Sequence, residues 1–207
     1  MIYQCDCSRK EIADSYNQRP AQQGVDGLVY PGTCRHKTVV KSLHANRIIV
    51  DSNPIAFTDA IQGNIQQNLA QDVGDFVLKR ADGLYAYQLA VVVDDFKQGI
   101  THILRGADLL DSTPRQIYLQ QLLDYTTPQY AHIPVARNAT HEKLSKQTLA
   151  PAIDAAQAST LLTQALNFLG QQPPKDLSNH SANDILKWAK QHWDITKVAQ
   201  QRSIVLS

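Results

Sequence analysis

The chain has 207 residues, which is enough for one large domain or two small ones with a buried core. Hydrophobic residues make up 43% of it and charged residues 19%, as in ordinary globular proteins. Its 20 basic and 19 acidic side chains leave a net charge of +1, whereas proteins that bind nucleic acid mainly through phosphates are usually more basic. Composition therefore excludes a nucleic-acid contact spread over the whole surface, and any contact with RNA is expected on a local patch.

Neither a membrane span nor a secretory signal is visible in the sequence. The longest apolar stretch, residues 89–93, is far too short to cross a bilayer. The first seven residues contain neither a basic nor an apolar segment. A cytoplasmic location is the resulting prediction.

Residues 1–50 predict a small, loop-rich unit that needs a metal. They contain all three cysteines, Cys5, Cys7 and Cys34, together with turn-forming glycines and a proline. An odd number of cysteines argues against a disulfide framework. A unit with little core of its own often needs a metal in order to fold.

Zinc is the metal that this cysteine pattern favours. Cys5 and Cys7 place two thiolates within reach of one ion and Cys34 can return as the third, while zinc takes four tetrahedral ligands. Two residues compete for the fourth position: His36, two residues after Cys34, and Tyr30, four residues before it. General zinc chemistry favours His36, because a phenol ligand is unusual. The alternative is three free thiols without a metal, which the clustering beside turn glycines disfavours.

The middle of the chain, residues 51–150, predicts an α/β core. Residues 75–80 and 84–94 are rich in aromatic and β-branched residues, and the Asp-Gly pair between them predicts a β-hairpin. Residues 101–104 predict a further strand.

The second half of this core begins with a helix signal. Ser112, Thr113 and Pro114 combine a capping residue with a proline in the first turn. Residues 130–135 then predict another short strand, and a polar loop runs through residues 143–147.

Residues 151–207 predict a helical tail. Residues 152–169 favour a helix that ends at Gly170. Ser181 to Asp184 is similar to a capping box, and apolar residues follow it at helical spacing.

Three side-chain types in the core can carry chemistry. Lys143 and Lys146, in the pentapeptide Lys-Leu-Ser-Lys-Gln, can clamp a polyphosphate, although such loops are usually solvated surface. Tyr87 and Arg105 stand on or at the ends of predicted apolar strands, and an arginine there can pair bidentately with a carboxylate. Taken alone, these two residues are better explained as a core aromatic and a structural ion pair.

Several motifs together resemble the second half of the class I glutamyl-tRNA synthetase catalytic domain. The Asp-Gly turn is followed by Tyr-Gln-Leu-Ala-Val-Val-Val-Asp-Asp and then by Ile-Leu-Arg-Gly-Ala-Asp-Leu-Leu-Asp-Ser-Thr-Pro-Arg-Gln. Tyr-Ala-His-Ile-Pro-Val precedes Lys-Leu-Ser-Lys-Gln, where that class has its lysine-serine signature loop. The order of these motifs over residues 75–150 makes the match specific. It implies a partial, Rossmann-like class I core with a zinc-binding insert at residues 1–50 and a helical region at residues 151–207.

Two details point to the glutamyl-Q tRNA(Asp) branch of this family. The chain ends 60 residues after Gln147 (207 minus 147), which leaves no room for the large helical anticodon-binding region of the ordinary enzymes. The Cys-x-Cys and Tyr-x-x-x-Cys spacing is similar to the zinc site of that branch, in which the tyrosine is a ligand. This resemblance places Tyr30 ahead of His36, although His36 fits the Cys-x-His pattern of the ordinary enzymes.

The resemblance implies a two-step ligase reaction. The carboxylate of glutamate attacks the α-phosphate of ATP without tRNA, giving glutamyl-adenylate and pyrophosphate. Glutamate then passes to a hydroxyl on the cyclopentenediol ring of queuosine, in the anticodon loop of tRNA(Asp), and magnesium accompanies ATP. The residues that the resemblance implies are Tyr87 and Arg105 for glutamate, Lys143 and Lys146 for catalysis with Lys146 on ATP, and Cys5, Cys7, Tyr30 and Cys34 for a structural zinc.

The sequence departs from the class I pattern at its beginning. That class starts with a nucleotide-binding half carrying a His-x-Gly-His-like signature, and nothing similar precedes Tyr3. We therefore expect that the chain lacks the amino-terminal half of the nucleotide-binding domain and does not form glutamyl-adenylate by itself. Glutamate-dependent pyrophosphate exchange by the 207-residue chain would contradict this expectation. Two alternatives are a fragment of an ordinary glutamyl-tRNA synthetase and a non-catalytic zinc module that binds RNA or glutamate.

Overall fold

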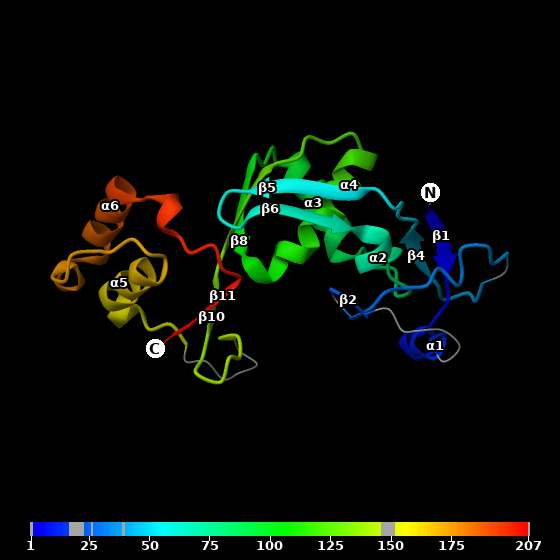
Figure 1. The fold of residues 1–207 in the computed structure, drawn as a ribbon, viewed down its shortest axis with the longest axis horizontal. Helices are drawn as coiled ribbons and strands as arrows, with labels where there is room; N and C mark the ends of the chain where they lie inside the picture. The colour runs from blue at the N-terminus through cyan, green and yellow to red at the C-terminus, as the bar shows by residue number, and fades with distance from the viewer. Residues whose placement is uncertain (1, 17–22, 26, 39, 146–151, 207) are drawn as a thin grey trace. The chain divides into compact units, whose positions relative to one another are not determined.

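The structure is a computed structural model that describes residues 2–16, 23–25, 27–38, 40–145 and 152–206. The chain divides into two compact units (Figure 1). The first comprises Met1–Phe57, Asn64–Thr101 and Asp111–Pro128, and the second comprises Thr58–Gly63, His102–Leu110 and Gln129–Ser207. The three-part division at residues 50 and 150 stays a prediction.

The amino-terminal part of the first unit is built on a three-stranded antiparallel sheet with the order β1-β4-β7. A capping box starts its helix, because the side chain of Ser8 accepts from the N–H of Glu11 while the Glu11 carboxylate accepts from the N–H of Ser8. The elements are β1 (Ile2–Cys5), α1 (Arg9–Asp14), the short pair β2 (Gln23–Gly24) and β3 (Gly27–Leu28), β4 (Ala45–Ile48) and β7 (Phe76–Lys79).

The rest of the first unit supplies helices and one further pair of strands. Pro114 occupies the first turn of α4, as predicted, but the side chain of Ser112 forms no capping hydrogen bond. The helix is buried from Thr113 to Gln120. The elements are β5 (Pro54–Asp59), whose last two residues belong to the second unit, β6 (Gly63–Asn68), whose first residue also belongs to it, α2 (Leu69–Asp72), α3 (Tyr87–Lys97) and α4 (Thr113–Leu122).

The predicted strand at residues 84–94 is wrong. The chain turns after β7, as the Asp-Gly pair predicted, but only Tyr85 pairs back with Lys79 before α3 begins at Tyr87. Three consecutive valines favour a strand by local propensity. In the structure these valines lie on a helix that packs against α4, and Val92 is its buried residue. Tertiary packing overrides the local preference here.

The second unit contains the parallel part of a four-stranded sheet with the order β6-β5-β9-β8. The predicted strands at residues 101–104 and 130–135 are confirmed, with Pro134 dividing the latter into two. Strand β8 runs parallel to β9 along its length, and Asp59 at the end of β5 pairs with Tyr130. The elements are β8 (His102–Gly106), the 3-10 helix η1 (Ala107–Ser112), whose last two residues belong to the first unit, β9 (Gln129–Ile133), β10 (Val135–Arg137) and β11 (Ser203–Val205).

The helical tail belongs to the second unit and has its own small core of Leu166, Leu177 and Ile185. The helix predicted from residue 152 begins later, because Asp154 caps a 3-10 turn first. It ends before Gly170 as expected, where φ is +73° and a Cβ would lie 2.2 Å from the Lys197 carbonyl oxygen. The elements are η3 (Ala155–Gln157), α5 (Ala158–Phe168), η4 (Leu177–Asn179), α6 (Ala182–His192) and η5 (Ile195–Lys197).

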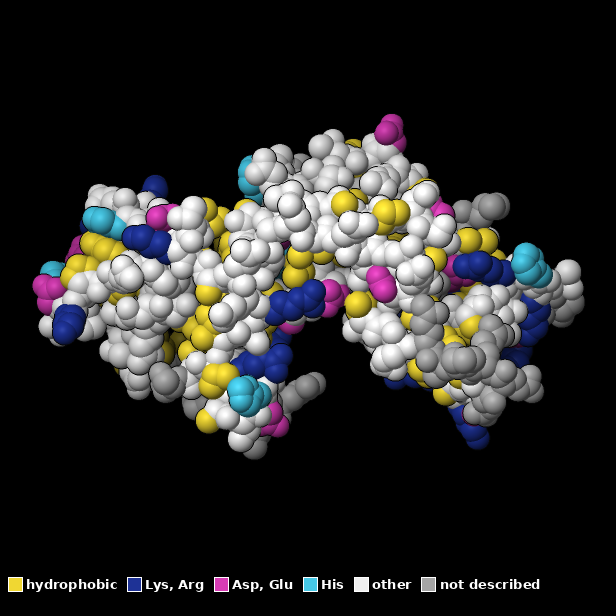
Figure 2. Space-filling view, in the orientation of Figure 1, with side chains coloured by type: hydrophobic (Ala, Val, Ile, Leu, Met, Phe, Trp, Pro, Cys, Tyr) yellow, Lys and Arg dark blue, Asp and Glu magenta, His cyan; other side chains and the backbone are white. Residues whose placement is uncertain are grey.

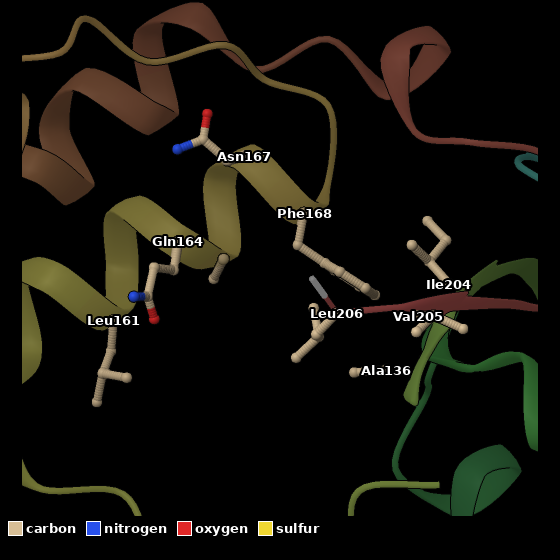
Figure 3. A pocket seen from close by; sticks show the side chains of 9 residues that line it. Ala136, Leu161, Gln164, Asn167, Phe168, Ile204, Val205 and Leu206 are labelled. Carbon is tan, nitrogen blue, oxygen red and sulfur yellow. The ribbon is translucent and has the colours of Figure 1, made fainter. Parts of the chain in front are cut away.

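A pocket of about 690 Å³ lies where α5 faces the parallel pair β10–β11 (Figure 3). Leu161 and Phe168 line it from the helix, and Ile204 and Leu206 line it from the carboxyl-terminal segment. Among the residues that the structure describes, no helix combines the length and apolar character that crossing a membrane requires.

Candidate functional site

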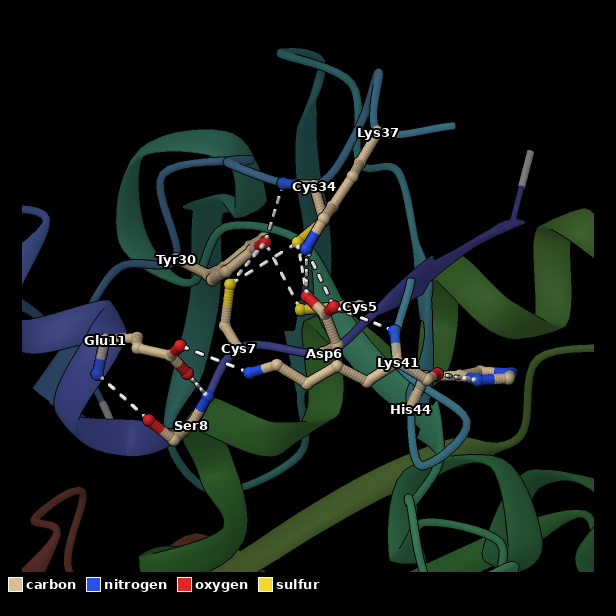
Figure 4. Close-up of polar contacts among 10 residues, drawn as sticks. All are labelled: Cys5, Asp6, Cys7, Ser8, Glu11, Tyr30, Cys34, Lys37, Lys41 and His44. Atoms are coloured by element: carbon tan, nitrogen blue, oxygen red, sulfur yellow. Dashed lines mark hydrogen bonds and ion pairs between the residues drawn. The ribbon is translucent and has the colours of Figure 1, made fainter. Parts of the chain in front are cut away.

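All three cysteines converge in the first unit (Figure 4). Cys5 ends β1, Cys7 follows it in the turn before α1, and Cys34 returns from the segment after β3. Their sulfur atoms all lie within 4.8 Å of one another, and Cys7 Sγ is 3.4 Å from Cys34 Sγ. Two sulfurs bound to one tetrahedral zinc at about 2.3 Å would lie about 3.8 Å apart. This cluster could therefore bind a metal ion.

Tyr30 directs its hydroxyl into the same cluster. Its oxygen lies 3.3 Å from Cys5 Sγ and 3.8 Å from Cys7 Sγ, and it accepts from the N–H of Cys34 at 3.0 Å. The residue is buried, whereas His36 is exposed. Gly74 makes this placement possible, because its φ is +74° and a Cβ would lie 2.6 Å from the Tyr30 carbonyl oxygen.

Charged residues surround the cluster. Asp6, between the first two cysteines, accepts from the ammonium of Lys37 at 2.7 Å with both oxygens and from the N–H of Lys41. These contacts lower the pKa of Asp6 to about 2. Burial, together with the contact to Cys34, raises the pKa of the Cys7 thiol to about 12. A bound metal must therefore displace the Cys7 proton.

Arg47, on β4, lies directly over the ring of Tyr30. Its guanidinium carbon is 3.9 Å from the ring centroid, and its Nη1 donates to the Asp75 carbonyl oxygen at 2.7 Å. The pKa of Cys5 is lowered: burial raises it, but hydrogen bonds from Tyr30, the Cys7 backbone and Arg47 outweigh burial. Arg47 thus places a positive charge beside the cluster.

Asp75 joins the segment that carries the cysteines (residues 2–50, here called the cysteine unit) to β7. Its side chain is fully buried, and it accepts from Arg35 Nε and Nη2 at 2.6 and 2.7 Å, from the Tyr3 hydroxyl at 2.6 Å and from the Val50 N–H at 3.1 Å. Arg35 follows Cys34 directly in the chain. The position of this cysteine is therefore tied to a buried carboxylate of the sheet.

Arg105 lies in the second unit, on β8, opposite His132 on β9. Its Nε donates to His132 Nε2 at 2.9 Å, and its guanidinium carbon lies 5.5 Å from the centroid of the Tyr130 ring. His132 Nδ1 in turn lies 2.6 Å from Asp59 Oδ2. Sequence reasoning singled out Arg105 and missed His132 and Asp59, although His132 stands within the Tyr-Ala-His-Ile-Pro-Val motif.

Asp59 is held in a fully buried site. Its Oδ1 accepts from the N–H groups of Ile61, Gln62 and His132 at 2.8–3.1 Å. Burial raises its pKa, but these bonds and the one from the His132 ring lower it more, and the net effect is a decrease. The side chain is therefore an anion in the interior of the second unit.

The remaining predicted residues have different surroundings. Lys143 forms an ion pair with Asp108 at 2.6 Å, while Lys146 lies outside the described residues. Tyr87 is the first residue of α3 in the first unit, not part of a strand, and its side chain is 54% exposed. Tyr87 and Arg105 belong to different units.

Basic and acidic side chains are interspersed on the face of the molecule that Figure 2 shows. Figure 2 shows Lys and Arg spread over the visible surface, with Asp and Glu among them. This distribution agrees with the net charge of +1.

The chain is similar to known proteins over almost its whole length. The family "tRNA synthetases class I (E and Q), catalytic domain" matches residues 2–200. The glutamyl-Q tRNA(Asp) synthetase of Dechloromonas aromatica is 52% identical over 208 residues, which cover 100% of this chain and 68% of the relative. The enzymes of that name from Neisseria meningitidis serogroup B and Pseudomonas aeruginosa are 51% and 46% identical, each over 96% of this chain and over 66% and 64% of the relative. The chain thus spans about two thirds of the length of these relatives.

Solved structures agree on the fold. The glutamate-tRNA synthetase of Elizabethkingia anophelis superposes with a TM-score of 0.69 at 19% identity, covering 100% of this chain and 48% of that one. A glutamate tRNA ligase of Elizabethkingia meningosepticum gives a TM-score of 0.70 at 19% identity, covering 100% and 47%. The chain has the mixed α/β fold of a class I synthetase catalytic domain.

Proposed function

This chain belongs to the class I glutamyl- and glutaminyl-tRNA synthetase family, among the glutamyl-Q tRNA(Asp) synthetases, and we propose that it is part of an ATP-dependent glutamate ligase. The carboxylate of glutamate attacks the α-phosphorus of ATP, pyrophosphate leaves, and no tRNA is needed. The activated acyl group then moves to a hydroxyl of queuosine in the anticodon loop of tRNA(Asp), releasing AMP. The names of the relatives support this choice of acceptor over that of an ordinary glutamyl-tRNA synthetase.

The proposed glutamate site is built around Arg105. This guanidinium is fixed on a strand rather than on a loop, and a fixed guanidinium can bind a carboxylate bidentately. Tyr87 offers an exposed hydroxyl at the start of α3 and is proposed as a second glutamate contact. The contact that holds Arg105 Nε on His132 Nε2 is the observation that carries the proposed glutamate site.

The proposed phosphate contacts come from the Lys-Leu-Ser-Lys-Gln segment. Lys146 stabilises the negative charge that develops as pyrophosphate leaves, and Lys143 assists it from the position where it pairs with Asp108. Magnesium accompanies ATP and lies on its phosphates. The ion pair of Lys143 supports a fixed position for the start of this segment.

The proposed zinc site consists of Cys5, Cys7, Cys34 and Tyr30. The convergence of three sulfurs and one phenol oxygen at 3.3–3.8 Å supports a four-coordinate ion. The exposure of His36 supports Tyr30 as the fourth ligand. With all four positions taken by protein ligands, the ion has a structural role and holds the cysteine unit in shape.

The proposed function is tested with an enzyme in which this chain is joined to the amino-terminal third of the Dechloromonas aromatica relative, here called the completed enzyme. We expect glutamate-dependent exchange of pyrophosphate into ATP without tRNA. We also expect radiolabelled glutamate to enter tRNA(Asp) that carries queuosine and not tRNA(Asp) that lacks it. Transfer to the 3′ end of tRNA(Glu) instead would show an ordinary glutamyl-tRNA synthetase.

Arg105→Ala in the completed enzyme is expected to abolish glutamate activation while the fold survives. Removing one member of a desolvated charge pair costs about 2–5 kcal/mol, which corresponds to a loss of at least about 30-fold in kcat/KM for glutamate. Thermal unfolding of the same variant provides the control. A lower melting temperature with normal glutamate dependence would assign Arg105 to structure instead.

A further inference from the structure

Three side chains from three strands form one hydrogen-bonded line in the second unit. Asp59 ends β5, His132 lies on β9, and Arg105 lies on β8. Asp59 and His132 are 2% and 0% exposed, so two polar groups are buried behind Arg105. Burying such groups is costly unless every one of them is satisfied.

The contact with Arg105 fixes the proton on His132. A guanidinium Nε always donates, so His132 Nε2 must accept. The proton therefore sits on Nδ1, which donates to Asp59 Oδ2 at 2.6 Å. His132 is neutral in this arrangement, and its tautomer is selected at both nitrogens.

Asp59 selects this tautomer because it is an acceptor only. Its other oxygen is already bound by three backbone N–H groups, from Ile61, Gln62 and His132. The carboxylate cannot rotate without breaking these bonds. These bonds also stabilise the negative charge of the carboxylate, so Asp59 can stay ionised beside a neutral histidine.

We propose that His132 and Asp59 are positioning residues that orient the Arg105 guanidinium toward a carboxylate of glutamate. The inference rests on the proposed function. Once Nε is held by His132, rotation about the end of the side chain is prevented and the direction of the two Nη groups is set. A binding group that is displaced by a fraction of an ångström from its productive position loses much of its effect on binding and catalysis.

Asp59→Asn is the sharpest test. The amide oxygen is expected to take over the three backbone N–H bonds, which leaves the NH₂ group facing His132 Nδ1. The histidine must then accept at Nδ1 and carry its proton on Nε2, opposite the Nε–H of Arg105. Nitrogen-15 correlation spectra of the histidine rings in the 207-residue chain should show an Nδ1–H tautomer for His132 and an Nε2–H tautomer in the variant.

The kinetic test uses the completed enzyme and glutamate-dependent pyrophosphate exchange. Asp59→Asn should raise the KM for glutamate by about 10- to 100-fold, as expected for losing one hydrogen bond to a charged group, and leave the KM for ATP unchanged. A purely structural role would change both KM values together or only the melting temperature.

Two substitutions of His132 separate its contacts. His132→Asn keeps a donor for Asp59 and removes the acceptor for Arg105, so the KM for glutamate should rise as in Asp59→Asn. His132→Gln places an amide oxygen near the former Nε2 and should keep a glutamate KM close to that of the wild type. His102→Asn, at the exposed start of β8, is the matched control and should change neither KM.

The outcomes distinguish this inference from the proposed function. A wild-type completed enzyme without glutamate-dependent exchange would overturn the proposed function and the positioning role with it. An active wild type whose Asp59→Asn and His132→Asn variants fold and keep the wild-type glutamate KM would overturn the positioning role alone. A wild-type His132 with its proton on Nε2 would do the same.

Discussion

Replacing Asp75 by Ala is expected to lower the free energy of unfolding by about 3–5 kcal/mol, the usual cost of removing one partner of a buried ion pair. Four donor groups lose their acceptor in this variant: two on Arg35, the Tyr3 hydroxyl and the Val50 N–H. Folded domains are stable by only about 5–15 kcal/mol. Urea unfolding followed by circular dichroism would measure the loss.

Two further variants provide reference values for the stability loss in Asp75→Ala. Asp75→Asn keeps one acceptor oxygen in the same volume and should cost less than Asp75→Ala. Asp82→Asn is the surface control, because the pair of Asp82 with Arg80 is 46% and 59% exposed and such pairs contribute about 0–1 kcal/mol. Equal stability losses in Asp75→Ala and Asp82→Asn would show that the buried contacts do not tie the cysteine unit to β7.

The stabilisation by Asp75 should depend on pH in a defined direction. Burial raises the pKa of Asp75, but hydrogen bonds from Arg35, Tyr3 and Val50 lower it more, so the folded-state pKa lies below the ordinary value of 3.8. A lowered folded-state pKa means that the contribution is complete above pH 3.8 and is lost as the pH falls through the folded-state value. The stability difference between the wild type and Asp75→Asn should therefore shrink below about pH 4.

Local sequence signals predicted the elements that depend on local chemistry. The proline in the first turn of α4, the glycine after α5 and the serine before α6 each act within one helical turn. The cysteines were recognised because all three fall within the first 34 residues, where few other side chains could serve as ligands of one ion. The family resemblance identified Arg105 as a contact for glutamate. Without the resemblance, an arginine at this position is better explained by a structural ion pair.

Contacts between distant segments could not be predicted in this way. Asp59 and His132 are 73 residues apart, and Asp75 and Arg35 are 40 apart. Nothing in the neighbouring residues distinguishes these acids from surface aspartates, since their burial follows from the sheet pairing. Helix α3 was missed for a related reason, because its valines favour a strand until their packing against α4 is known.

Removing one thiolate from the cysteine cluster is expected to abolish zinc binding and to unfold the cysteine unit. Among the residues that the structure describes, the cluster is part of a small core whose buried members are Cys5, Tyr30 and Cys34, with Tyr3, Cys7 and Ile12 against them. In such units the free energy of metal binding is folding free energy, about 10–16 kcal/mol for zinc-finger peptides. Wild-type protein purified without added metal should contain one zinc per chain by elemental analysis, and Cys34→Ser should contain none.

The fourth ligand is decided by a matched pair of variants. Tyr30→Phe keeps the ring beneath Arg47 and removes only the oxygen that lies 3.3 Å from Cys5 Sγ. Chelator competition should show weaker zinc binding in this variant, because a three-ligand site leaves one position to water. His36→Ala removes the exposed alternative and should leave zinc affinity unchanged. Normal affinity in Tyr30→Phe with weak binding in His36→Ala would exchange the two roles, and a fully folded wild type without zinc would remove the metal site altogether.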